Sequence, residues 1–257
     1  MHRVTMMKPL PFLAVLLLAA GPVLAQTASP GPTLAAVQAR GAVLCGAPNA
    51  APGFGVMDSQ GIYRGLDADT CRAIGAAVLG DASKTRFVSV SSPARLPALQ
   101  SGQIDVLART TTWTQNRDTA NGLNFTAVTF YDGQGFLVRR STGVQRARDL
   151  QGATICATAG STSELNLADW ARGNNIRFQP LVFESNEEAR NAYGAGRCDA
   201  YSTDASQLAG MRTAQRDPSE HIILPDLISK EPLAPAVRHG DDQWFDIVRW
   251  TIFALIE

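Results

Sequence analysis

Short apolar runs alternate along the first half of the chain with longer segments whose apolar residues recur every three or four positions. The runs predict strands and the longer segments predict helices. In the helix expected over 67–79, Cys71, Ile74 and Val78 share one face, and Asp67 can cap its start. The pattern predicts strands over 42–46, 85–90 and 105–108, and helices over 67–79 and 93–101.

A second series of the same kind begins after residue 150. It predicts strands over 154–157, 178–183 and 198–202 and helices over 162–172, 186–195 and 204–216. Strands over 221–224 and 233–237 and a helix from 241 to the end complete the chain. Alternating elements of this kind are typical of an α/β fold with mostly parallel sheets covered by helices.

The two series share a sequence frame. Segments 98–105 (ALQSGQID) and 192–199 (AYGAGRCD) both follow the pattern A-x-x-x-G-x-x-D. In each, a predicted helix ends at glycine, a strand starts at aspartate, and hydroxyl residues follow the strand. One such match is common in α/β proteins, but two at corresponding places indicate two similar lobes.

The stretch DVLARTTTWTQNRD, residues 105–118, places Arg109, a run of threonines and Arg117 at the end of an expected strand. Hydroxyls, amides and guanidinium groups suit a small anion. Ligands of open α/β sheets bind beyond the carboxyl ends of strands. If the two lobes face each other across a cleft, we expect both hydroxyl clusters to meet there.

Residues 1–25 have the features of a secretory signal peptide. Arg3 and Lys8 precede an apolar run over 10–20, and Val23-Leu24-Ala25 supplies the small residues of a cleavage site. The apolar run is too short to span a bilayer. We expect cleavage after Ala25, a flexible leader over 26–33, and export to the periplasm.

Charge and composition exclude some classes of function. The chain has 23 basic and 23 acidic residues, so removing Arg3 and Lys8 leaves a small negative excess. No basic block is present, and we predict no nucleic-acid partner. His221 and His239 lie apart from the cysteines and no C-x-x-C motif occurs, so we predict no metal and no cofactor.

Four cysteines remain after cleavage, Cys45, Cys71, Cys156 and Cys198. An exported chain favours disulfides, and four cysteines allow three connectivities. We favour Cys45–Cys71 and Cys156–Cys198, because each bond would then lie within one series and leave the lobes free to move.

Together these segments resemble the periplasmic substrate-binding proteins of polar amino acid ABC importers, and most closely the general L-amino-acid-binding members. The resemblance extends over residues 34–257. It is carried by GLDADTCRAIGAAVLGD (65–81), RLPALQSGQIDVLARTTTWTQNRD (95–118), GLNFTAVTFYDGQGFLVRRS (122–141), AGSTSELNLADW (159–170), GRCDAYSTD (196–204) and ISKEPLAPAVRHGDDQWFDIVRW (228–250).

The resemblance implies a type II periplasmic-binding-protein fold, with two doubly wound lobes joined by two crossover strands. Lobe 1 would comprise 34–136 and 231–257, and lobe 2 would comprise 137–230, with crossings at 135–138 and 229–232. It also implies a monomer that delivers a free L-amino acid to the permease and ATPase subunits of an ABC importer. Members usually continue beyond the position of Glu257, so we expect a fragment or a chain lacking a C-terminal part.

Arg117 matches the family's carboxylate-binding arginine, in the pattern T-x-T-x-x-R that starts at Thr112. A guanidinium offers two parallel donors to a carboxylate, and Thr112 would add a hydroxyl and an amide. Asp204 matches the aspartate that binds the ligand's ammonium group. A helix cap is the alternative role for Asp204, and the two roles are compatible.

The remaining expected ligand contacts are less directly tied to a motif. Arg109 and Thr110 would present main-chain groups, and Thr162 would present the amides of a helix N-terminus. Asn49 and Ser92 fall where the family's pocket walls lie. Because related proteins often place aromatic residues at the position of Ser92, the resemblance implies a permissive pocket for polar or acidic amino acids.

Two other functions fit the same fold. A periplasmic enzyme of the cyclohexadienyl dehydratase type would need a general acid, and Glu164 is the acidic candidate near the second lobe's helix start. No G-x-S-x-G or H-E-x-x-H motif occurs, so we predict a binding protein and no enzyme. A sensory module would need a separate signalling partner.

Overall fold

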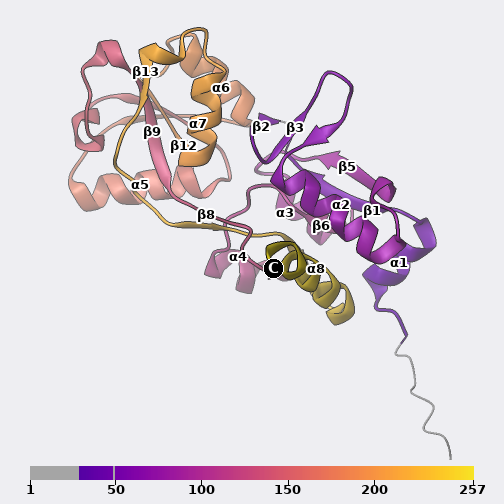
Figure 1. Cartoon of the computed structure of the whole chain (residues 1–257). Coiled ribbons are helices and arrows are strands. Elements are labelled where there is room, and N and C mark those ends of the chain that lie inside the picture. The colour runs from indigo at the N-terminus through magenta and orange to yellow at the C-terminus, as the bar shows by residue number, and fades with distance from the viewer. Residues whose placement is uncertain (1–28, 49) are drawn as a thin grey trace, which may run out of the picture.

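The computed structural model describes residues 29–48 and 50–257, and the predicted signal peptide lies outside them. Two five-stranded sheets form two lobes (Figure 1). The first sheet has the order β5 (Thr85–Ser89), β1 (Val43–Ala47), β6 (Val106–Leu107), β15 (Ala236–Arg238) and β7 (Leu123–Phe125). The second has the order β11 (Gln179–Phe183), β10 (Thr154–Thr158), β12 (Ala200–Asp204), β9 (Gln134–Arg139) and β13 (His221–Ile223).

The two sheets share one topology. In each, the first strand of its series lies between the second and the third, and all three run parallel. An antiparallel strand comes next, β15 beside β6 and β9 beside β12. The prediction of two similar α/β units is therefore confirmed.

The shared A-x-x-x-G-x-x-D frame has the same structure in both lobes. Gly102 and Gly196 both have positive φ, +82° and +78°, where a side chain would be strained. The carboxylate of Asp105 accepts from the amide of Leu44, and that of Asp199 accepts from the amide of Thr154, each at 2.8 Å. Each aspartate thus ties the start of its strand to the first strand of the same series.

Helices cover both faces of each sheet. Around the first sheet, α1 (Pro32–Arg40), α2 (Leu66–Leu79) and α8 (Asp242–Ile256) share one core that contains Val37, Ile74 and Trp244. The other face carries α3 (Arg95–Gln100). Around the second sheet, α5 (Thr162–Asn174) packs on one core, and α6 (Asn186–Gly194) and α7 (Ala205–Thr213) pack on another.

Smaller elements complete the described chain. They are α4 (Gln115–Ala120), the three-stranded sheet of β2 (Ala50–Ala51), β3 (Gly55–Met57) and β4 (Tyr63–Arg64), and 3₁₀ turns at Ala82–Lys84, Arg140–Thr142, Ala147–Leu150 and Pro218–Glu220. No described helix is long and apolar enough to cross a bilayer.

The lobes are joined by a two-stranded antiparallel pair, β8 (Phe130–Asp132) with β14 (Glu231–Leu233). The first crossing and the lobe boundary that we expected near residue 136 fall inside β9. That strand lies wholly in the second sheet, because Gly135 pairs with Thr203 and Phe136 with Ser202. The described chain changes lobes just before β9, around Gly133.

Both disulfides are the predicted ones. Cys45 on β1 is bonded to Cys71 on α2, and Cys156 on β10 is bonded to Cys198, with Cα–Cα separations of 6.2 and 5.7 Å. Each closes a loop within one lobe, where it limits the freedom of the unfolded chain. Neither bond crosses the connecting strands, so the hinge between the lobes is unconstrained by them.

Besides the lobe boundary, the sequence prediction was wrong for two elements. The segment expected as one strand over 233–237 divides between β14 and β15 around Pro235, which has no amide hydrogen to donate to a ladder. The expected leader over 26–33 overlaps α1, in which Thr33 is buried. Gly31 gives α1 no side-chain cap, and Asp241, 208 residues away from Thr33, accepts from the amides of Thr33 and Leu34 instead.

Asp241→Ala is expected to destabilise lobe 1 by about 1–2 kcal/mol. Its carboxylate also accepts from the amide of Trp244, so one buried side chain caps both α1 and α8. Urea denaturation of the variant measures the loss. Asp242→Ala is the control, since Asp242 is exposed, and equal losses in the two variants would contradict the capping role.

Candidate functional site

The strand ends of both lobes lie close together, as expected. Thr112 Oγ1 lies 3.3 Å from Thr162 Oγ1, and the Arg95 guanidinium donates to the carbonyl of Gly160 at 3.5 Å. A Cβ on Gly210 of α7 would meet Pro52 at 2.6 Å. The described lobes are therefore in contact with each other.

In lobe 1, the chain leaves the end of β6 through a turn with a strained backbone. Thr110 has φ +40°, a left-handed conformation that is unfavourable for a β-branched residue. Its amide donates to the buried carboxylate of Asp67 at 2.8 Å. Asp67 was predicted as a helix cap, but α2 begins one residue earlier with Gly65 at the cap position, and Asp67 instead fixes the turn.

Arg109 is held at the same turn. Its Nε donates to the carbonyl of Val90 at 2.6 Å, and its side chain is buried. Desolvation lowers the pKa of Arg109 to about 10, although nearby Asp67 opposes the shift. Desolvation raises the pKa of Asp67 to about 7, although the hydrogen bond from the amide of Thr110 opposes this shift.

A small cavity of about 20 Å³ lies between the lobes. Five of the predicted site residues line it: Ser92, Arg109, Thr110, Thr162 and Asp204. The other lining residues are Arg95, Ser161, Ser163, Asn186, Thr203 and Gln207. The N-terminus of α5 therefore faces two arginines of lobe 1, and amides at a helix N-terminus attract anions. Asn49, also predicted, lies outside the described residues.

Asp204 ends β12 and is 4% exposed. It occupies the cap position of α7, yet its side chain makes no capping bond and accepts from Gln207 Nε2 at 2.9 Å. Desolvation raises the pKa of Asp204 to about 7, with smaller contributions from the charges of Asp132 and Glu231. The geometry therefore does not support a role for Asp204 as a helix cap alone.

Arg117 and Thr112 lie beside the cavity and do not line it. Arg117 is buried on α4, and its Nη1 donates to the carbonyl of Thr112 at 2.9 Å. Desolvation lowers its pKa, and the charges of Glu231 and Asp204 oppose this shift. The hydroxyl of Thr112 donates to Glu231 at 2.6 Å, so the hinge strand β14 orients this loop.

Glu231 connects the hinge to both lobes. It is 2% exposed, and besides Thr112 it accepts from Asn166 Nδ2 on α5 at 2.7 Å and from the hydroxyl of Ser229. No sequence motif separated this glutamate from an ordinary strand residue. Its hydrogen bonds reach residues of both lobes, so it can hold the loop at Thr112 in place beside α5.

Arg95 is a site residue that the sequence prediction missed. It is 3% exposed, and its Nε has no hydrogen-bond partner in the described part of the chain. Its pKa is lowered well below the usual value by desolvation and by Arg117 and Arg109, while Asp204 opposes the shift. An arginine at the start of a short apolar helix was the available signal.

Glu164 does not take the position of a general acid. It lines neither this cavity nor the larger one beside it. Its carboxylate accepts from the amide of Gly160, just before α5, and its amide donates to the hydroxyl of Ser161, the N-cap residue of α5. Glu164, the general acid considered for the enzyme alternative, is thus hydrogen-bonded at the start of α5 and lies outside the cavity.

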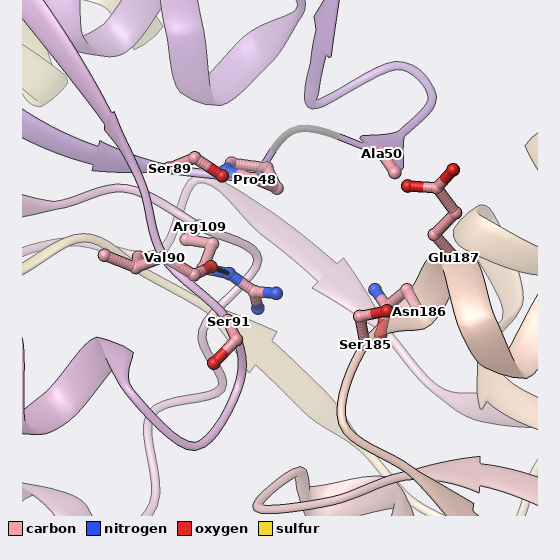
Figure 2. Close-up of a pocket in the computed structure, with 9 residues that line it drawn as sticks. All are labelled: Pro48, Ala50, Ser89, Val90, Ser91, Arg109, Ser185, Asn186 and Glu187. Carbon is pink, nitrogen blue, oxygen red and sulfur yellow. Dashed lines mark hydrogen bonds between the residues drawn. The ribbon is translucent and has the colours of Figure 1, made fainter.

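A larger cavity of about 150 Å³ adjoins the small one and shares Arg109 and Asn186 with it. Figure 2 shows the Arg109 guanidinium reaching from lobe 1 toward the start of α6. The other lining residues are Pro48, Ala50, Ser89, Val90, Ser91, Ser185 and Glu187. Most of these side chains are small or polar.

Comparison with known proteins identifies the family. The model of the bacterial extracellular solute-binding proteins, family 3, matches residues 43–257. The chain is 53% identical over 230 residues to the general L-amino acid-binding periplasmic protein AapJ of Rhizobium johnstonii, covering 90% of this chain and 67% of that protein. It is 48% identical to the glutamate/glutamine/aspartate/asparagine-binding protein BztA of Rhodobacter capsulatus, covering 87% and 66%.

A solved structure is similar along most of the chain. A periplasmic binding protein from Brucella ovis with glutathione bound is 48% identical, with a TM-score of 0.82, covering 85% of this chain and 69% of that one. The chain thus spans about two thirds of the length of these relatives. The predicted two-lobed type II fold is confirmed, and the chain belongs to the bacterial extracellular solute-binding proteins, family 3.

Proposed function

We propose that the chain binds a free L-amino acid between its lobes and delivers it to the permease of an ABC importer. The observation that carries this proposal is the small cavity, in which Asp204 of lobe 2 lies opposite a group of buried arginines of lobe 1. An amino acid carries an ammonium group and a carboxylate group on the same α-carbon. A buried acid facing buried guanidinium groups is complementary to that zwitterion.

The ligand's two poles have natural partners. Its ammonium group would pair with Asp204. Its carboxylate would lie near the α5 N-terminus at Thr162, within reach of Arg117 and Thr112. Arg109 and Thr110 would line the same cavity.

Arg95 supports the preference for polar or acidic ligands. If Arg117 binds the α-carboxylate, the Nε of Arg95 remains without a partner at the same cavity. A side-chain carboxylate or amide would satisfy it, and an aliphatic side chain would leave it unpaired, which costs free energy. Ser92, at the cavity wall, is equally polar. The name of BztA, a glutamate/glutamine/aspartate/asparagine-binding protein, agrees with this class of ligand, whereas the name of AapJ covers L-amino acids in general.

Transport would follow from closure. The β8–β14 pair would act as the hinge between lobes 34–133 and 231–257 on one side and 134–230 on the other. Contacts made by the ligand to both lobes would favour the closed form, which the permease and its ATPase would recognise. We propose a monomer that acts in the periplasm after cleavage at Ala25.

Isothermal titration calorimetry of the mature chain against the twenty L-amino acids tests the proposal. We expect saturable binding of glutamate, aspartate, glutamine or asparagine in one-to-one stoichiometry. D-glutamate is the control, because the mirror image cannot present both charged groups and the side chain to the same partners. A chain that binds none of the twenty would refute the proposal.

Binding is expected to weaken on acidification. The ligand's ammonium group needs the ionised form of Asp204, whose pKa is raised to about 7. Protonation below this pH removes the partner charge, so affinity should be about tenfold lower at pH 6 than at pH 8. Asp67 has a similarly raised pKa, so the same titration with Asp204→Asn separates the two groups. If the pH dependence persists unchanged in that variant, Asp204 is not its source.

A further inference from the structure

A chain of hydrogen bonds lies behind Asp204 in lobe 2. Gln207 Nε2 donates to Oδ2 of Asp204 at 2.9 Å, and Gln207 Oε1 accepts from Asn186 Nδ2 at 3.0 Å. The Oδ1 atom of Asn186 accepts from the hydroxyl of Thr158 at 2.9 Å. Each of these bonds is donated in the direction of Asp204, so the chain runs from a hydroxyl through two amides to a carboxylate.

Separate elements of lobe 2 supply these residues. Thr158 and Asp204 end β10 and β12, which are adjacent parallel strands, so both lie at the same edge of the sheet. Asn186 is the first residue of α6, and Gln207 is the third residue of α7. Thr158, Gln207 and Asp204 are all buried. Hydrogen bonds in such a site are stronger than in water and polarise one another.

The chain fixes the orientation of the Gln207 amide. Nε2 donates to the carboxylate of Asp204, whereas an inverted amide would place Oε1 against it and repel its ionised form. The bond from Asn186 to Oε1 selects the first orientation, and the bond from Thr158 fixes Asn186 in the same way. Among the described residues, Gln207 is the one hydrogen-bond donor to this carboxylate. Oδ1 of Asp204 is therefore left for a ligand in the small cavity.

We propose that Gln207, Asn186 and Thr158 form a relay of positioning residues that keeps this carboxylate ionised and reserves Oδ1 for the ligand's ammonium group. The inference rests on the proposed amino acid binding and explains how a buried acid keeps its charge. Desolvation raises the pKa of Asp204 to about 7, and the bond from Gln207 opposes that rise. Loss of the relay would therefore leave the acid protonated up to a higher pH, without a charge for the ammonium group.

Other groups that face Asp204 stay in place when the relay is changed. Arg95 favours the ionised form of Asp204, whereas Asp132 and Glu231 disfavour it. The complete set of titratable and charged groups that interact with it is Arg95, Arg117, Asp132, Tyr201 and Glu231. None of them belongs to the relay, so a variant of the relay tests the hydrogen bonds alone.

The test is a double-mutant cycle of Gln207→Met and Thr158→Val, titrated by calorimetry with L-glutamate and L-glutamine. Methionine keeps the length of Gln207 without its donor, and valine keeps the shape of Thr158 without its hydroxyl. Thr158 lines neither cavity, so an effect of its hydroxyl on the ligand passes through Asn186.

The losses should depend on pH. At about pH 6 we expect affinity to fall about tenfold in Gln207→Met and about threefold in Thr158→Val. At about pH 8 much of the Asp204 population is ionised in every variant, so each loss should be at most about twofold. The double variant should bind no more weakly than Gln207→Met alone, because that change already interrupts the relay.

Thr154→Val is the matched control, because Thr154 begins the strand that Thr158 ends and lines neither cavity. Its affinity should equal that of wild type at both pH values. Thr158→Ser keeps the hydroxyl donor and should restore wild-type binding. Equal losses at the two pH values, or losses that add in the double variant, would overturn the relay alone. Wild-type protein that binds none of the twenty amino acids would overturn the proposed function itself.

Discussion

Arg117→Ala is expected to weaken amino acid binding by about 2–5 kcal/mol. The guanidinium is buried, and its orientation is fixed by its bond to the carbonyl of Thr112. Alanine would remove the charge-assisted partner of the ligand's carboxylate and leave that carboxylate in a partly desolvated site. Calorimetry with the tightest-binding amino acid measures the loss.

Two further variants distinguish a lost contact from a damaged fold. Arg117→Lys keeps the charge without the two parallel donors, so its affinity should fall between those of wild type and Arg117→Ala. Arg172→Ala removes an arginine that is 76% exposed and should leave affinity unchanged. Wild-type affinity in Arg117→Ala would contradict the assignment of the carboxylate partner.

The internal repeat was predictable because its signals are local. Helix-ending glycines and strand-starting aspartates occur within a few residues of each other, at 98–105 and again at 192–199. The same locality placed Thr110, Thr162 and Asp204 at strand or helix ends, and the shared topology of the sheets then brings those ends together.

The missed features depend on contacts between distant segments. Helix α1 depends on Asp241 for its cap, and the turn at Thr110 depends on Asp67, 43 residues away. Local pattern assigns Asp67 to a cap because aspartate favours that position, and it cannot show which way a side chain points. Arg95 and Glu231 were missed for the same reason.

The lobe boundary illustrates a second limit. Residues 130–139 contain two strands, β8 and β9, separated by Gly133. Both segments are extended and partly apolar, so their combined hydrophobic pattern cannot be told from that of one long strand. Only the pairing partners, β14 for β8 and β12 for β9, separate the hinge from the second sheet.

Asp204→Asn is expected to weaken amino acid binding by about 2–5 kcal/mol while making the folded protein more stable at pH 8. Asparagine keeps the shape of the side chain but cannot balance the ligand's ammonium charge. The effect on stability has the opposite sign, because burial raises the pKa of Asp204 from 3.8 to about 7. Above pH 7 the wild-type fold therefore contains an ionised carboxylate that burial disfavours.

The pH dependence of unfolding gives this prediction a second readout. Between about pH 4 and 7, folded Asp204 holds a proton that the unfolded chain has lost, so the wild type loses stability as pH rises through this window. The Asn variant lacks that contribution, and its advantage in urea denaturation should be present at pH 8 and absent near pH 4. A variant that loses both affinity and stability at pH 8 would indicate a structural role. Lower affinity together with higher stability at pH 8 is the result expected if the buried charge of Asp204 serves to bind the ligand.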